Sequence, residues 1–168
     1  RSFIRSNSKN YVIRFLEKEK KINSDIIEIH NRPNYIKQIR EQYKKKIFLY
    51  FHNDPLSMNG SRTENERSYL IKNVDKIIFN SKWSRNRFFL NSSFKDLMIN
   101  KSNICYQSTS KVDVNIKSKK KIITFVGKLN SAKGFDIFGK TIKKILDKYN
   151  DWKAYIIGDE PREKMFFE

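Results

Sequence analysis

Short runs of apolar residues alternate with amphipathic segments along most of this chain of 168 residues. The apolar runs are rich in Ile, Phe and Val, as strands buried on both faces of a parallel sheet tend to be. They predict six β-strands, at 25–30, 47–52, 76–80, 103–107, 122–126 and 153–157.

Between the predicted strands, apolar residues recur at helical spacing. This spacing predicts helices at 11–21, 35–43, 62–72, 83–90 and 135–149. Ser81 is the expected N-cap of the helix at 83–90, because its hydroxyl can accept a bond from a free backbone N–H group. Strands that alternate with helices in this way predict an α/β fold with parallel sheets.

One stretch interrupts the alternation. Residues 110–121 show little hydrophobic periodicity and end in a run of lysines, and we interpret 116–121 as a linker. Residues 1–115 then form part of a first α/β domain, and residues 122–168 form the start of a second one. Because the chain begins with Arg1 and stops directly after an apolar triplet, we expect a fragment in which both domains are incomplete.

The chain has 36 Lys and Arg residues against 18 Asp and Glu residues, a formal net charge of +18. The basic residues are spread over the whole sequence, which favours a generally basic surface over a dedicated patch. Attraction to an anionic membrane or to a lipid-linked partner is a second explanation, and nucleic-acid binding is a third and weaker one. No apolar run approaches the ~18–20 residues of a membrane span, and no signal peptide is recognisable.

Cys105 is the single cysteine, so a disulfide within the chain is excluded. This is compatible with a reducing compartment. Because Cys105 lies in the predicted strand at 103–107, we expect it to be a small core residue.

The segment 125–134 is the most informative stretch. An apolar strand ends at Gly127, a polar loop contains Lys128 and Lys133, and Gly134 precedes an amphipathic helix. The N-terminus of a helix presents unpaired N–H groups and a partial positive charge, so this loop predicts a phosphate site. A strand–helix turn with solvated lysines is the structural alternative.

The two histidines of the chain each follow a predicted strand, His30 before Asn31 and Arg32, and His52 before Asn53 and Asp54. Ligands collect beyond the carboxyl ends of parallel strands, where an imidazole can act as an acid, a base or a hydrogen-bond donor. A histidine that only caps a loop is the alternative.

A third strand end, at 156–162, also passes through a glycine into a polar turn. There Pro161 is suited to begin a helix, and the turn could line the same cleft as the loop at 127–134. We find no metal site, because Cys105 stands alone and the histidines are far apart in sequence.

Five segments in this order resemble the family 4 glycosyltransferases, which are retaining, nucleotide-sugar-dependent enzymes of the GT-B fold. They are 25–33, 51–55, 78–83, 125–134 and 157–161. Each segment alone is a weak signal, whereas together they extend over nearly the whole chain. The resemblance implies two Rossmann-like domains that face a cleft, with the donor held mainly by the second.

The resemblance also implies roles for individual residues. Gly127, Lys128, Lys133 and Gly134 would bind the donor diphosphate, and the two cations would stabilise the charge that develops on this leaving group. His52 would be the catalytic residue, near the reacting sugar, where it orients the sugar or the acceptor by hydrogen bonds.

On the acceptor side the resemblance implies a second set of residues, His30, Asn31, Arg32, Asn53 and Asp54. The partners would be a nucleotide-sugar and a glycan or lipid-linked acceptor, without nucleic acid, cofactor or catalytic metal. The implied role is that of a hexosyltransferase in cell-surface polysaccharide or lipopolysaccharide synthesis, cytoplasmic and optionally in contact with the inner face of an anionic membrane.

The chain departs from the family in two ways. Lys128 stands where the family often has arginine, so a bidentate phosphate contact becomes a point-charge contact. The glycine-rich loop of the first domain and the carboxylate pair of the second are absent from residues 1–168, so we expect the isolated chain to have little or no transferase activity. A basic α/β binding module for nucleic acid or anionic lipid, and a sugar-phosphate or nucleotide-handling enzyme, remain as alternatives.

Overall fold

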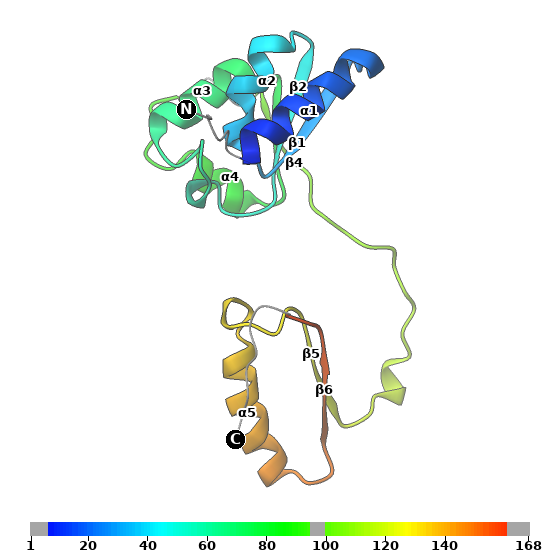
Figure 1. Cartoon of the computed structure of the whole chain (residues 1–168). Coiled ribbons are helices and arrows are strands. Elements are labelled where there is room, and N and C mark those ends of the chain that lie inside the picture. Colours follow the sequence, from blue (N-terminus) through cyan, green and yellow to red (C-terminus); the bar gives the residue numbers. More distant parts are fainter. Residues whose placement is uncertain (1–6, 95–99, 161–168) are drawn as a thin grey trace, which may run out of the picture. The chain divides into compact units, whose positions relative to one another are not determined.

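The computed structural model describes residues 7–94 and 100–160. Contacts between Cα atoms divide the chain into two compact units, Arg1–Thr109 and Ser110–Glu168. Both units combine helices with parallel strands (Figure 1), which confirms the predicted α/β class.

The first unit contains a four-stranded sheet in the order β1-β2-β3-β4. The strands are β1 (Ile26–His30), β2 (Lys46–Phe51), β3 (Lys76–Phe79) and β4 (Ser102–Ile104), and every neighbouring pair is parallel. The register pairs His30 with Tyr50, and Tyr50 with Ile78. All four strands therefore end at the same edge of the sheet.

Within the described residues, one face of this sheet is buried and the other is more exposed. The alternate positions that point into the core are Ile27, Ile29, Ile47, Leu49, Phe51, Ile77 and Phe79. The residues between them, such as Glu28, His30 and Tyr50, are exposed or half-buried. The expectation that the strands are buried on both faces is wrong within the described residues, since apolar content alone does not distinguish one covered face from two.

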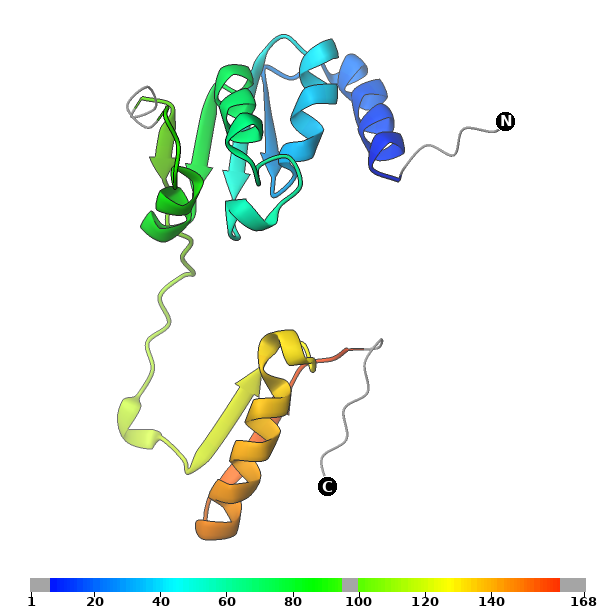
Figure 2. The same cartoon turned by 90° about the vertical axis from the view of Figure 1, so that its left-hand side faces the viewer.

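The helices of the first unit are α1 (Asn7–Ile22), α2 (Ile36–Gln42), α3 (Glu64–Asn73) and α4 (Lys82–Phe88). In Figure 2, α1, α2 and α3 lie in a row along the sheet. Their buried residues, among them Val12, Ile36 and Leu70, join the strand residues in one core.

Two of these helices begin with side-chain caps. The predicted N-cap at Ser81 is confirmed, because its hydroxyl accepts a bond from Ser84 N–H. Thr63 and Glu66 form a reciprocal capping box at the start of α3. Short 3-10 turns precede α2 (η1, Pro33–Tyr35) and follow β2 (η2, Pro55–Ser57).

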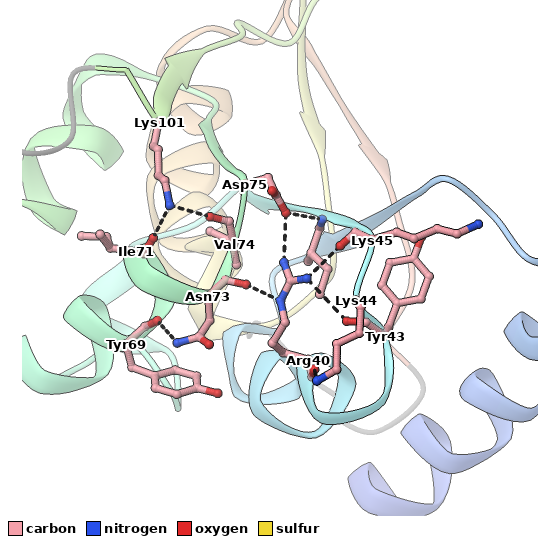
Figure 3. A network of polar contacts seen from close by, with 11 residues as sticks. Arg40, Tyr43, Lys44, Lys45, Tyr69, Ile71, Asn73, Val74, Asp75 and Lys101 are labelled. Atoms are coloured by element: carbon pink, nitrogen blue, oxygen red, sulfur yellow. Dashed lines mark hydrogen bonds and ion pairs between the residues drawn. The ribbon is translucent and has the colours of Figure 1, made fainter.

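A polar network stabilises the amino-terminal edge of the sheet (Figure 3). The guanidinium of Arg40 donates to the carbonyl groups of Asn73 (2.7 Å) and Lys45 (2.8 Å) and to the carboxylate of Asp75 (2.9 Å). Asp75 also accepts a bond of 2.9 Å from the N–H group of Ile47 in β2. Burial opposes ionisation of Asp75, but these hydrogen bonds outweigh it and lower its pKa. The network thus connects α2 to the starts of two strands, at the edge opposite the histidines.

β4 is shorter than the predicted strand at 103–107, and Cys105 lies just beyond its end. The thiol is exposed, so the expectation of a core residue is wrong. Backbone pairing with β3 includes Cys105, whose N–H group donates to the carbonyl oxygen of Phe79 (2.9 Å).

The second unit contains the parallel pair β5 (Ile122–Val126) and β6 (Lys153–Ile157) and the helix α5 (Phe135–Lys148). Both strands have the predicted bounds. Phe125 packs against Phe135 and Phe138, with ring centroids 5.2 Å apart in each case, and α5 runs beside the two strands (Figures 1 and 2).

Before β5, residues 110–121 contain one 3-10 turn, η4 (Ile116–Ser118). After β6, the predicted helix start at Pro161 lies outside the described residues. Among the residues that the structure describes, the helices are too short or too polar to cross a lipid bilayer.

Candidate functional site

The carboxyl ends of the four strands of the first unit bring several polar side chains to one edge. β1 ends at His30, His52 directly follows β2, Asn80 follows β3, and Gln107 lies three residues after β4. Parallel pairing makes this edge common to all four strands. Both histidines lie at this edge, as their positions in the sequence predict, and the neighbouring strands β1 and β2 bring them into contact.

The backbone of His52 is held from both sides by asparagine side chains. Its N–H group donates to Oδ1 of Asn31 (2.8 Å), and its carbonyl group accepts from Nδ2 of Asn80 (2.7 Å). Asn31 itself has φ +52°, a left-handed conformation that asparagine tolerates better than most residues. The peptide of His52 is therefore fixed by the ends of the two neighbouring strands.

The imidazole of His52 is also held at both nitrogens. Nε2 lies 2.8 Å from Nδ1 of His30, and Nδ1 lies 2.8 Å from the amide nitrogen of Gln107. On the far side of His30, Nε2 lies 3.5 Å from a carboxylate oxygen of Glu28. The result is a continuous polar chain from Gln107 through both histidines to Glu28.

Tyr50 provides a rigid neighbour for both imidazoles. Its ring is nearly parallel to each of them, with centroids 4.6 Å from His52 and 5.3 Å from His30. The phenol hydroxyl donates to the carbonyl oxygen of Cys105 (2.9 Å). Hydrogen bonding with the Cys105 side chain, together with burial, raises the pKa of Tyr50 to about 12. Tyr50 therefore stays a neutral phenol at physiological pH.

Two of the other predicted acceptor-side residues, Arg32 and Asp54, have local structural partners. Arg32 donates to the carbonyl oxygen of Asn31 (2.8 Å), and the side chain of Asn53 is exposed. Asp54 accepts from Leu56 N–H and pairs with Arg87 of α4, whose nitrogens lie 3.0 and 3.3 Å from its carboxylate oxygens. Hydrogen bonding from Arg87 outweighs burial and lowers the pKa of Asp54.

A cavity of about 250 Å³ opens beside His30. Tyr11 of α1 and Tyr35 form an aromatic part of its wall, with ring centroids 5.8 Å apart, while Glu28, His30 and Arg32 provide polar groups. Two of the predicted acceptor-side residues, His30 and Arg32, thus line the same space.

In the second unit, the loop between β5 and α5 has the predicted strand–glycine–helix form. Gly127 N–H donates to the carbonyl oxygen of Ile157 (3.0 Å) and continues the pairing with β6. Asn130 caps the 3-10 turn η5 (Ser131–Lys133) through Lys133 N–H. Gly134 has φ +73° and is the N-cap of α5, so a glycine suits the turn into the helix.

The lysines of this loop differ in their surroundings. Lys133 is exposed, whereas Nζ of Lys128 lies 3.8 Å from the carboxylate of Glu160, with 68% of the Lys128 side chain exposed. The side chain of Glu160 is 8% exposed, and its carboxylate also accepts from Nδ2 of Asn130 (3.0 Å). A carboxylate therefore lies beside one of the two cations that the sequence predicts for phosphate binding.

Sequence reasoning identified His52, His30 and the loop at 127–134 as candidates but missed Asn80, Gln107 and Glu160. Asn80 and Gln107 carry the same signal as the histidines, since each is a polar residue just beyond a strand end. The described residues bring together no group of three or more His, Cys, Asp or Glu side chains placed to hold a metal ion. The expectation of a metal-free reaction stays a prediction.

Comparison with known proteins bears directly on the second unit. Residues 107–168 match the family model of the glycosyl transferases group 1. This span contains β5, β6, α5 and the loop that joins β5 to α5. The match supports glycosyl transfer in general, and it specifies neither the donor nor the stereochemical course. No curated protein matches the sequence.

Ten chains of solved structures match the structure. One of them comes from the "Crystal structure of accessory secretory protein 1,2 and 3 in Streptococcus pneumoniae", with a TM-score of 0.56 and 9% sequence identity. The match extends over 91% of this chain and 36% of that chain, so this chain spans about a third of the other's length. At this identity the likeness shows a shared fold.

Proposed function

We propose that this protein is a glycosyltransferase that moves a sugar from a nucleotide-sugar donor to a glycan or lipid-linked acceptor with retention. The observation that carries the proposal is the family match over residues 107–168, because it coincides with the glycine- and lysine-containing loop after β5. A role as a cytoplasmic hexosyltransferase of cell-surface polysaccharide or lipopolysaccharide synthesis, optionally at an anionic membrane, is part of the proposal.

In this proposal, the loop at 127–134 binds the donor diphosphate. Breaking the bond between sugar and phosphate leaves negative charge on the diphosphate, which Lys128, Lys133 and the N-terminus of α5 stabilise as it develops. The side-chain-free backbone at Gly127 and Gly134 lets a phosphate come close. The exposure of both lysines supports this role, since an incoming diphosphate reaches them without unfolding the loop.

His52 orients a hydroxyl group of the sugar or of the acceptor. Support comes from the rigid placement of its ring and backbone by Asn31, Asn80 and Tyr50. A preorganised imidazole loses little freedom on binding, which is what a positioning role requires. His30, Arg32 and the aromatic cavity wall beside them form the acceptor side, with Asn31, Asn53 and Asp54 in the adjoining loops.

Binding of nucleoside diphosphates tests the donor site without requiring turnover. We expect UDP, GDP or ADP to bind in a calorimetric titration, and Lys128→Ala and Lys133→Ala each to weaken binding roughly tenfold, which corresponds to about 1.4 kcal/mol. Lys140→Ala removes an exposed lysine from the same unit, within α5, and controls for net charge. Unchanged affinity in both loop variants would refute this role of the loop.

The net charge of +18 favours a second candidate, a basic module that binds nucleic acid or anionic lipid. A steep dependence of DNA affinity on salt, combined with tight binding at low salt, would support it. Weak DNA binding together with saturable diphosphate binding supports the transferase.

A further inference from the structure

We propose that Gln107, His30 and Glu28 are positioning residues that hold His52 in the tautomer with its proton on Nε2, so that Nδ1 presents a lone pair. The tautomer follows from the contacts in the first unit alone. Its use on a sugar hydroxyl rests on the proposed function.

The first constraint comes from Gln107. The atom that lies 2.8 Å from Nδ1 of His52 is the side-chain amide nitrogen, which donates hydrogen bonds and accepts none. We therefore assign Nδ1 as the acceptor. In a neutral imidazole only one nitrogen carries a proton, so the proton of His52 is on Nε2.

The second constraint comes from the other side of the ring. Nε2 of His52 donates to Nδ1 of His30, so Nδ1 of His30 carries a lone pair. The proton of His30 is then on its Nε2 atom. That N–H faces the Glu28 carboxylate at 3.5 Å, and a negative charge favours a proton over a lone pair there. The amide at one end and the carboxylate at the other thus require the same direction for every hydrogen bond between them.

The surroundings keep this arrangement in place. Asn31 and Asn80 fix the His52 peptide, and Tyr50 lies parallel to both imidazoles. The Tyr50 hydroxyl bonds to the carbonyl oxygen of Cys105, so it does not compete for an imidazole nitrogen. Glu28 and Tyr50, with Cys105 beyond it, are the titratable groups next to the two histidines among the described contacts.

The tautomer determines which chemical group a ligand can offer. Nε2 of His52 donates to His30, whereas Nδ1 of His52 is bonded to Gln107, an exposed residue in the segment after β4. A ligand that replaces the Gln107 amide must donate a hydrogen bond to Nδ1, because His30 and Glu28 then keep the proton on Nε2. A sugar hydroxyl can donate, while a carbonyl or a fully ionised phosphate oxygen cannot. The site therefore selects hydrogen-bond donors, among them sugar hydroxyl groups, which deepens the role that we propose for His52.

Nitrogen-15 NMR of the imidazole side chains tests the proposal on the full chain. The sequence contains two histidines, so His30→Gln assigns the spectrum by removing one set of signals. At alkaline pH, where free imidazoles are neutral, we expect the proton of His52 on Nε2 and a chemical shift typical of a lone pair at Nδ1. A proton on Nδ1, or two equally populated tautomers, would overturn the proposal.

Two variants at position 107 separate positioning from packing. Gln107→Glu offers an acceptor in place of a donor, so we expect Nδ1 of His52 to take up a proton while Nε2 keeps its own, because Glu28 still fixes the direction of the hydrogen bonds at the other end. Gln107→Ala leaves the contact between Glu28 and His30 intact. We therefore expect the Nε2–H tautomer of His52 to remain the more populated one, by a smaller margin over the Nδ1–H tautomer. An unchanged His52 spectrum in Gln107→Glu, in a protein whose backbone amide spectrum shows it folded, also refutes the assignment. Because no nucleotide is added, a wrong tautomer leaves the diphosphate-binding result untouched.

Discussion

Gly158 lies so close to Gly127 that no side chain fits between them. A Cβ atom on Gly158 would be 1.8 Å from the carbonyl oxygen of Gly127, far inside any van der Waals contact. Gly127 directly follows β5 and Gly158 directly follows β6. The two glycines lie side by side because Gly127 N–H donates to the carbonyl oxygen of Ile157. The shape of the proposed diphosphate loop thus depends on a glycine in a different segment.

We therefore expect Gly158→Ala to distort the loop after β5. The substitution forces the backbone at Gly127 to move, which we expect to destabilise the protein by about 1–3 kcal/mol and to abolish nucleoside diphosphate binding. Thermal unfolding and a calorimetric titration measure the two effects.

Gly134→Ala compares this steric overlap with backbone strain at a second glycine of the proposed diphosphate loop. Gly134 has φ +73° but no heavy atom within 4 Å of a Cβ atom placed on it, so only the left-handed backbone is strained, at about 1–2 kcal/mol. If Gly158→Ala binds nucleoside diphosphates as well as the unsubstituted protein does, the close approach to Gly127 is not important for the loop.

The carboxylate of Glu160 gives a second prediction for the same loop. It lies 3.8 Å from Nζ of Lys128 and therefore competes with a diphosphate for that cation. Glu160→Gln keeps an acceptor for the Asn130 amide but removes the charge. We expect tighter binding of UDP, GDP or ADP, by roughly fivefold, or about 1 kcal/mol of removed repulsion.

Asp159→Asn removes a neighbouring exposed charge and reports the long-range part of this effect. Equal gains in the two variants would show that net charge alone is responsible. Weaker binding in Glu160→Gln would show instead that Glu160 orients Lys128 for the ligand.

The sequence predicted the backbone of both units better than the side-chain contacts. β5 has the predicted bounds because Lys121 and Gly127 flank its apolar run, and Gly158 marks the predicted end of β6. The meeting of His30 and His52 followed from parallel strands that share an edge. The contacts of Gln107 with His52 and of Glu160 with Asn130 span 55 and 30 positions. Such pairs depend on strand register and on the path of the loops, which residue types do not specify.

The network around Arg40 predicts a dependence of stability on pH. Because hydrogen bonds lower the pKa of Asp75 in the folded state, its carboxylate stabilises the fold at neutral pH, above the ordinary value of 3.8. This stabilisation is lost as the pH falls through the lowered pKa, when Asp75 takes up a proton. We expect Asp75→Asn to destabilise the protein by about 1 kcal/mol at pH 7, and the difference from wild type to shrink below pH 4.

Urea unfolding at several pH values measures this difference. Asp25→Asn provides a control, since its side chain is 98% exposed and lies 3.5 Å from Lys45, whose side chain is 40% exposed. A constant difference between pH 7 and pH 3 for Asp75→Asn would mean that the lost contacts do not depend on the charge of Asp75.

The pair of Asp54 and Arg87 allows a structural role to be separated from ligand binding. Arg87 of α4 lowers the pKa of Asp54, which also caps the turn after β2. We expect a double-mutant cycle with Asp54→Asn and Arg87→Met to give a coupling energy of about 0.5–1 kcal/mol in the free energy of unfolding at pH 7. The coupling energy is small for an ion pair because both side chains are partly exposed. The coupling should fade at acid pH, where Asp54 is protonated. A coupling energy of zero at pH 7 would show that the pair with Arg87 does not stabilise the fold, and it would strengthen the assignment of Asp54 to the acceptor side.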